Sequence, residues 1–127
     1  MRFGWNSLLA LLGLATAVNA AVLEVPSGYA TIQAALDAAA PGDTVAVAAG
    51  TYTEQVVITT PVVLRGAGPD QTVIQAPLDL PHGVSTNDVR AVVCADNVSG
   101  GVTVAALTID GLGRQPADAG PFVGLMF

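Results

Sequence analysis

The chain contains no lysine, one cysteine and one histidine in 127 residues, and these shortages limit what it can do. Nucleic-acid binding depends on clustered Lys and Arg at the phosphates, whereas here four arginines face ten acidic residues. Cys94 has no cysteine partner within the chain, so we expect a small buried hydrophobic side chain rather than a reactive thiol. His82 has no second His or Cys nearby, and the sequence therefore predicts no metal and no other cofactor.

The N-terminus has the pattern of a signal peptide. Arg2 precedes the apolar run Leu8–Val18, and the small residues Asn19 and Ala20 favour cleavage before Ala21. A membrane-spanning helix needs about 20 apolar residues, and this run is shorter. We therefore expect export with removal of residues 1–20, leaving no membrane segment, to a secreted, periplasmic or cell-surface location. An uncleaved N-terminal anchor is the alternative.

A short helix is predicted from Tyr29 to Ala40. Its apolar residues recur at helical spacing and form one stripe, and either Ser27 or Thr31 can cap its N-terminus. Pro41 cannot continue the helix, so the helix should end before it. Such a short, alanine-rich helix is marginal alone and needs an apolar surface to lie on.

Closely spaced short strands follow the helix, separated by glycine and proline. We predict them at 44–48, 55–59, 62–65, 72–75, 90–95, 102–104 and 107–110. A sandwich or barrel would also contain short strands, but most gaps here are not two-residue hairpin turns. The phrases VVLRGAG (62–68) and LTIDGLG (107–113) look like one repeated unit. The pattern therefore favours an all-β parallel solenoid whose open end is covered by the helix.

Two segments depart from this rhythm. Residues 76–90 are rich in proline and polar side chains, and we interpret them as a loop that projects from one turn of the solenoid. The chain stops in an apolar stretch at Phe127, where a solenoid needs a polar cap. We therefore expect residues 21–127 to be the N-terminal part of a longer domain.

The order of motifs resembles a known superfamily. ATIQAALD (30–37), PGD (41–43), GTYTEQVVI (50–58) and VVLRGAGPDQTVI (62–74) look like the start of right-handed parallel β-helix proteins of the pectin lyase-like kind. The segment with Gly50, Tyr52 and Glu54 resembles the Gly-x-Tyr-x-Glu motif of pectin methylesterases. The resemblance implies a right-handed parallel β-helix, incomplete here, with a short N-terminal capping helix.

The same resemblance implies a carbohydrate-active protein that acts on a pectin-like cell-wall polysaccharide as an esterase or a lyase. The catalytic residues of such enzymes lie on later turns, so the resemblance assigns no catalytic residue here and leaves open whether the protein is an enzyme. The alternative is a non-catalytic secreted or cell-surface β-helix protein of the adhesin type. A third interpretation is an N-terminal module of a multidomain secreted protein.

Most candidate site residues also have a structural interpretation, which the sequence favours. We expect Tyr52 to pack at a corner and Glu54 to bond nearby backbone. The aspartates next to Gly, Pro or Asn are typical turn formers: Asp43, Asp70, Asp96 and Asp110. Asn97-Val98-Ser99 is an acceptor sequence for N-glycosylation, which matters only in a host that glycosylates.

Overall fold

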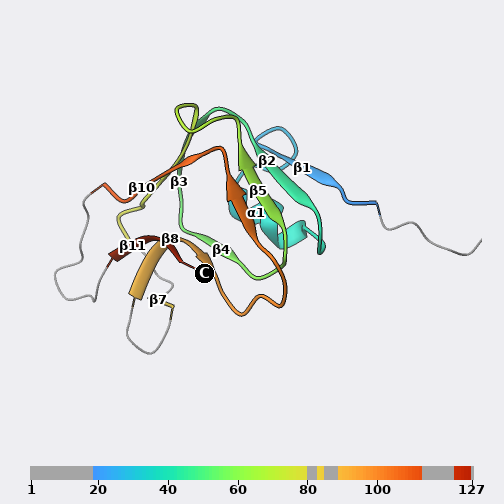
Figure 1. Cartoon of the computed structure of the whole chain (residues 1–127). Helices are drawn as coiled ribbons and strands as arrows, with labels where there is room; N and C mark the ends of the chain where they lie inside the picture. Colours follow the sequence, from blue (N-terminus) through green and yellow to red (C-terminus); the bar gives the residue numbers. More distant parts are fainter. Residues whose placement is uncertain (1–18, 80–82, 85–88, 113–121, 127) are drawn as a thin grey trace, which may run out of the picture.

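The computed structural model describes residues 19–79, 83–84, 89–112 and 122–126, whose strands form three sheets around a common core (Figure 1). Sheet A has the order β1 (Val22–Val25), β2 (Thr44–Val47), β5 (Val63–Gly66), β9 (Thr103–Ala105). Sheet B has the order β3 (Gly50–Thr53), β6 (Thr72–Gln75), β10 (Thr108–Asp110). Sheet C has the order β4 (Val56–Ile58), β8 (Val89–Ala95), β11 (Phe122–Met126). We call these three sheets together the three-sheet stack, because each sheet is a stack of strands.

The chain passes through the sheets in a fixed order. After β1, it adds β2, β3 and β4 to sheets A, B and C, then β5, β6 and β8, then β9, β10 and β11. Every pairing along these orders is parallel, and side chains at equivalent positions stand in rows, as with Tyr52, Ile74 and Ile109 in sheet B. The all-β expectation, with parallel strands and one short helix, is thus confirmed for the described residues.

Helix α1 (Ile32–Ala38) is shorter than the predicted Tyr29–Ala40. Thr31 is the N-cap, and its side chain accepts a hydrogen bond from the Ala34 amide at 3.1 Å. The backbone amide of Tyr29 donates instead to the Glu24 carbonyl, which holds that residue in a turn. At the other end the C-cap Ala39 donates its amide to the Leu36 carbonyl at 3.2 Å, and the next amide, of Ala40, donates to Asp43 Oδ2 outside the helix.

The predicted strands are present, and each of their bounds lies within one residue of the predicted position. The prediction missed β1 and β3, as well as β11 near the C-terminus. The interpretation of residues 76–90 as a loop is wrong in part, because β7 (Gly83–Val84) pairs antiparallel with the first two residues of β8. The signal-peptide prediction concerns residues 1–20, of which 1–18 lie outside the described residues.

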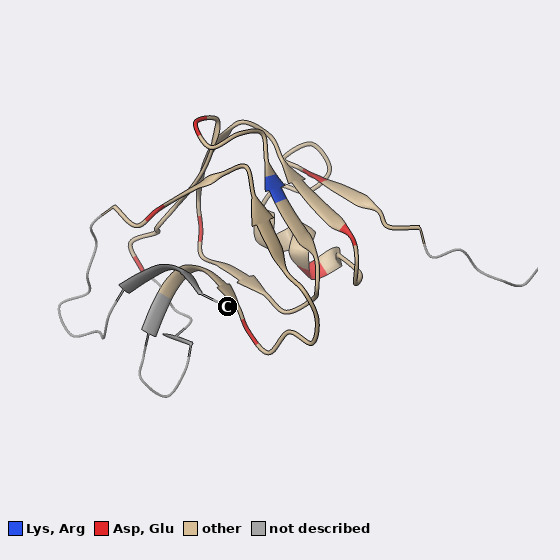
Figure 2. Ribbon diagram, viewed as in Figure 1, with Lys and Arg blue, Asp and Glu red and all other residues tan. Residues whose placement is uncertain are grey.

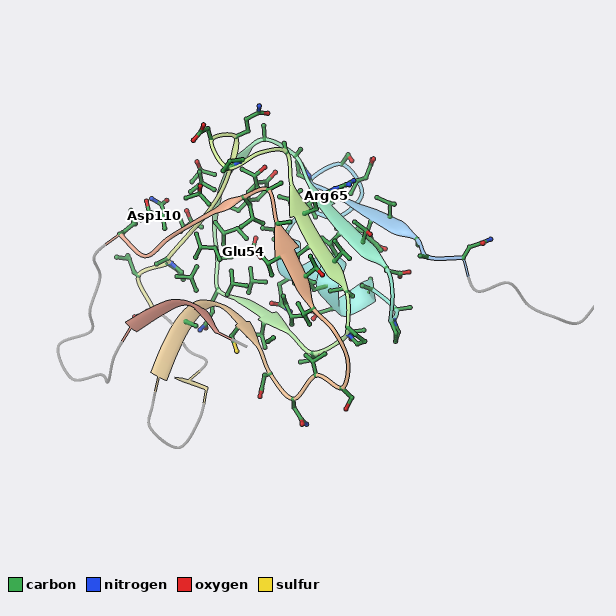
Figure 3. All side chains as sticks on the ribbon, viewed as in Figure 1. Glu54, Arg65 and Asp110 are labelled. Atoms are coloured by element: carbon green, nitrogen blue, oxygen red, sulfur yellow. The ribbon has the colours of Figure 1, made fainter. Side chains whose placement is uncertain are left out.

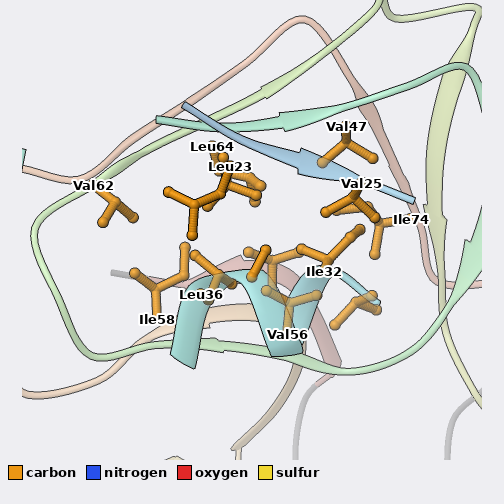
Figure 4. Close-up of a cluster of buried hydrophobic side chains, with 14 of the residues drawn as sticks. Leu23, Val25, Ile32, Leu36, Val47, Val56, Ile58, Val62, Leu64 and Ile74 are labelled. Atoms are coloured by element: carbon orange, nitrogen blue, oxygen red, sulfur yellow. The ribbon is translucent and has the colours of Figure 1, made fainter. Parts of the chain in front are cut away.

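The core lies between the sheets and beneath α1 (Figure 4). Side chains alternate between this core and solvent, as the burial of Val45 and Val47 in β2 illustrates. Ile32 and Leu36 place the apolar stripe of α1 on the same cluster. The expectation that the helix lies on an apolar surface is therefore confirmed, and α1 contacts β1, β2 and β4.

Thr72 is a polar residue within this core. It is fully buried at the start of β6, and its hydroxyl lies 3.2 Å from the carbonyl oxygens of both Val47 and Ala48. The same oxygen accepts a hydrogen bond from the Ala67 amide at 2.9 Å. One buried hydroxyl thereby ties the corner after β2 to the corner after β5.

Candidate functional site

Glu54, from the Gly-x-Tyr-x-Glu segment, lies at the N-terminus of α1. Its Oε1 accepts a hydrogen bond from the Gln33 amide at 2.9 Å, and its Oε2 accepts one from the Ile32 amide at 3.2 Å. These amides belong to the first helical turn, which has no intrahelical partner for them, and a negative charge is favourable there. Both carboxylate oxygens of Glu54 therefore bond backbone in this structure.

Gln33 uses its side chain to bond the backbone of β4. Its Oε1 accepts a hydrogen bond from the Val57 amide at 2.8 Å, and its Nε2 donates to the Val57 carbonyl at 3.0 Å. Nε2 also donates to Asp37 Oδ1, one helical turn further along, at 2.9 Å. The amide group is thus fixed from both sides, and it joins α1 to the edge of sheet C.

A hollow of about 590 Å³ lies beside these contacts, and we call it the α1 hollow. Its lining comes from α1, from β4 and its flanking residues, and from the segment after β6: Gln33, Asp37, Glu54, Gln55, Val57, Thr59, Pro77, Asp79. Most of these side chains carry hydroxyl, amide or carboxylate groups, which can donate to or accept from a hydroxyl-rich ligand. The lining has three carboxylates and no basic residue, so it disfavours anions.

A smaller hollow of about 290 Å³ lies on sheet A, and it contains both signs of charge. Glu24 and Arg65 line it together with small side chains of β2 and β5 and their flanking residues. Arg65 is the basic residue of this hollow, and acidic residues are spread over the ribbon in Figure 2. Arg65 does not line the α1 hollow, where Glu54 lies, so the two hollows do not share this cation (Figure 3).

Gly50 begins β3, and the ring of Tyr52, two residues further along the strand, lies beside it. The Tyr52 hydroxyl donates to the Ala48 carbonyl at 3.0 Å, and the ring packs half-buried against the core. Burial, and secondarily the negative charge of Glu54, raises the pKa of the Tyr52 phenol, which keeps the hydroxyl protonated as a donor. Gly50 has a φ of 149°, in the region that favours glycine.

The aspartates expected in turns do lie in or beside turns. Asp43 is the most buried of them: its Oδ1 accepts from the Ala21 amide and its Oδ2 from the Ala40 amide, both at 2.8 Å. These two hydrogen bonds, in that order, lower the pKa of the Asp43 carboxyl against the opposing effect of burial. Asp110 accepts from the Leu112 amide at 2.8 Å, an Asx-type turn. Asp70 and Asp96 are exposed.

Cys94 and Asn97 have opposite exposures. Cys94 is buried, as expected, and burial followed by the nearby negative charge of Asp96 raises the pKa of its thiol, which disfavours the reactive thiolate. Asn97 is exposed in the turn between β8 and β9 with a φ of 53°, a left-handed conformation that Asn adopts readily. His82 lies outside the described residues.

The polar groups of the α1 hollow are suited to binding hydroxyl groups. Among the described side chains, no three His, Cys, Asp or Glu residues are grouped to hold a metal. Sequence reasoning singled out Glu54 but missed Gln33, Asp37, Gln55 and Asp79, which surround it. The helical spacing of Gln33 and Asp37 was a usable signal, since residues four apart share one helix face. Nothing local placed Asp79 beside them.

Searches against protein-family models, curated proteins and solved structures found no match to this chain. In the part of the chain that the structure describes, no helix has the length and apolar character required to cross a bilayer.

Proposed function

We propose that this chain forms the N-terminal turns of a secreted right-handed parallel β-helix that binds a pectin-like polysaccharide. The fixed order in which the chain visits three parallel sheets supports the architecture, because a solenoid adds one strand to each sheet per turn. The cover that α1 gives to one end of the stack supports it too. A continuous stack of strands offers an extended surface on which a polymer can lie.

The α1 hollow is the observation that carries the carbohydrate proposal. Its volume of about 590 Å³ falls within the range of small-ligand pockets, roughly 300–1,000 Å³. Asp37 and Asp79 are exposed at the hollow, and Thr59 adds a hydroxyl. Carboxylates and hydroxyls positioned in this way suit the alternating donors and acceptors of a sugar ring.

The negative charge of the residues that line the α1 hollow indicates which form of the polysaccharide would bind. Three carboxylates without a base repel a free uronate, and the whole chain has a net charge of −6. A neutral, methyl-esterified stretch of pectin carries no such charge. We therefore expect esterified oligosaccharides to bind better than de-esterified ones.

Titration of the full chain with pectin-derived oligosaccharides, followed by NMR amide shifts, tests this function. We expect methyl-esterified oligogalacturonides to shift the amides of Thr59 and Asp79, and Asp79→Ala to weaken binding several-fold. Asp70→Ala is the matched control, because Asp70 is an equally exposed carboxylate outside the hollow lining. If the amide shifts are absent, or if Asp79→Ala leaves them unchanged, the α1 hollow is not the binding site.

The contacts of Glu54 favour the non-catalytic alternative for this segment. Both of its oxygens are bonded to the backbone of α1, so the carboxylate of the family-like motif is committed to structure. An esterase would release methanol from esterified pectin, and a lyase would form an unsaturated, ultraviolet-absorbing product. A folded protein that binds the polymer but yields neither product fits the adhesin-type alternative.

Export is part of the same proposal. We expect a mature N-terminus at Ala21, which intact mass and N-terminal sequencing of the secreted protein would check. In a glycosylating host, the exposed Asn97 turn should accept a glycan, and the added mass should vanish in Asn97→Gln.

A further inference from the structure

The hollow of about 290 Å³ on sheet A, which we call the sheet A hollow, has opposite charges on either side of a small residue. Glu24, Ala46 and Arg65 are register partners on the neighbouring strands β1, β2 and β5. Their side chains lie on the outer face of the sheet, since the preceding residue of each strand is buried. Two strand spacings, about 9–10 Å, separate the Cα atoms of Glu24 and Arg65. The methyl group of Ala46 leaves most of that space open.

The charged groups of this hollow are available to a ligand. Arg65 is exposed, and in the part of the chain that the structure describes its guanidinium has no hydrogen-bond or ion-pair partner. Glu24 is exposed too, and its Oε2 accepts a hydrogen bond from the Ser27 hydroxyl at 3.2 Å, which leaves Oε1 for another donor. Glu24 and Arg65 therefore line one hollow without neutralising each other.

The remaining lining limits the size of the ligand. Alanine and glycine at the ends of β2 and β5 and at the corners after them bring little side-chain volume into the hollow: Ala46, Ala48, Gly66, Ala67. A ligand can therefore lie close to the backbone between the two charges. The volume is near the lower end for small-molecule sites, roughly 300 Å³. This size suits a molecule like an amino acid better than a polymer.

We infer that the sheet A hollow binds a small zwitterion, whose carboxylate pairs with Arg65 and whose ammonium group pairs with Glu24. A guanidinium binds a carboxylate through two parallel hydrogen bonds, and an ammonium group donates to a carboxylate. The net charge of −6 disfavours a free anion, and Arg65 disfavours a free cation. A molecule with both charges avoids both penalties. This inference does not depend on the proposed function, because the sheet A hollow shares no lining residue with the α1 hollow.

Titration of the full chain with 4-aminobutanoate, followed by NMR amide shifts, tests the inference. Butanoate and butylammonium are the control ligands, because each keeps the carbon chain and only one of the two charges. We expect 4-aminobutanoate to shift the amides of Ala46 and Gly66 with a Kd of about 1 mM, since exposed ion pairs contribute little each. Each control ligand should bind at least about fivefold more weakly, because one ion pair is lost.

Variants of the two charged residues assign the contacts. Arg65→Gln and Glu24→Gln remove one charge each with little change in size, and both should weaken binding of 4-aminobutanoate about as much as the loss of one ligand charge does. Arg65→Lys keeps the positive charge without the planar fork, so it should bind more tightly than Arg65→Gln. Asp70→Asn is the matched control, because Asp70 is an exposed carboxylate outside the lining, and it should bind like the wild type.

Two results on the wild-type chain would overturn the inference, and neither requires a variant to fold. Butanoate that binds as tightly as 4-aminobutanoate would make the hollow an anion site. Amides of Ala46 and Gly66 that do not shift with 4-aminobutanoate would mean that no zwitterion binds there. Among folded variants, equal binding by Arg65→Gln and the wild type would contradict the assigned contact.

Discussion

The two ends of the three-sheet stack bury the same inner rows of side chains to different extents. At the N-terminal end, Val25 is 1% exposed and Val45 is fully buried in the core that α1 covers. At the other end, Val104 and Ile109 are only half-buried, although their register partners Leu64 and Ile74 are fully buried. Strand pairing is the same at both ends, so the difference lies in what covers the last row. At the N-terminal end α1 buries the inner side chains, whereas in the middle of the stack the next turn of strands buries them.

The largest expected effect comes from truncating a buried side chain in the middle of one row. Comparing its loss of stability with that of a truncation at the open end of the same row measures the difference between the two positions. Leu64→Ala should lower the free energy of unfolding by about 2–5 kcal/mol, because it leaves a cavity in a closed core. Val104→Ala, next in the same row of sheet A, should cost roughly 1 kcal/mol, because less area is lost and the site can relax. Urea unfolding of the full chain provides both values.

Equal costs for Leu64→Ala and Val104→Ala would mean that the open end is covered in solution. Ala105→Ser, at an exposed position in the same strand, is the control for altering β9 without touching the core. It should change the unfolding midpoint little, because surface substitutions away from special features usually stay within about 0.5 kcal/mol.

Much of this fold could be predicted because most strands have a local signal. Alternating Val45 and Val47, with glycine and proline at the corners, mark half-buried strands without reference to the rest of the chain. β1 was hidden because it follows directly on the region interpreted as a signal peptide. β3 was hidden because Gly50–Thr53 has threonines on its outer face and was interpreted as a motif. The handedness of the turns has no local signature.

The next largest loss of stability is expected at the corner that follows β5. Gly66 ends β5, and a Cβ there would overlap the Ala106 carbonyl oxygen and lie 2.8 Å from the Cβ atoms of Leu107 and Thr72. The open-end turn therefore sits directly on this glycine. We expect Gly66→Ala to destabilise the fold by roughly 1–3 kcal/mol through overpacking. Gly101→Ala, where nothing lies within 4 Å, is the matched control and should cost little.

Thermal or urea unfolding of both glycine variants gives the comparison. If Gly66→Ala were as stable as Gly101→Ala, the corner after β9 would not rest on β5, and the open end would be looser than the structure places it.

The helix-capped end is broken most simply at Glu54. Glu54→Ala removes the acceptor of two α1 amides, and we expect a loss of about 1–2 kcal/mol, the scale of a lost helix cap. Glu24→Ala removes an equal charge whose side chain accepts a hydrogen bond from the exposed Ser27 hydroxyl, and it should cost less. Circular dichroism and urea unfolding provide the measurements. If Glu54→Ala were as stable as Glu24→Ala, the Glu54 carboxylate would not stabilise α1, and the motif would have no such structural role.

The candidate site was less predictable than the fold, for a physical reason. Gln33 follows Ile32 on α1, and from the sequence it is an ordinary polar helix residue facing solvent. Only the packing of α1 against β4 gives it a backbone partner 24 residues away. Glu54 could be expected to bond backbone, but its partners in α1 lie more than 20 residues before it. Long-range pairing of this kind depends on the assembled stack.

The smallest effect is confined to acid pH and concerns Asp43, which ties the residue before β1 to the end of α1. The pKa of the Asp43 carboxyl is lower in the folded protein than its ordinary value of 3.8. The folded state therefore stabilises the ionised carboxylate relative to the unfolded chain. The stabilisation is complete above that ordinary value and disappears as pH falls through the lower pKa of the folded state. Asp43→Asn should be less stable than the wild type at pH 7, and the gap should narrow below about pH 4. Asp70→Asn controls for the lost charge at pH 7. A gap that stays constant down to pH 2 would mean that the charge of the Asp43 carboxylate does not stabilise this end of the molecule.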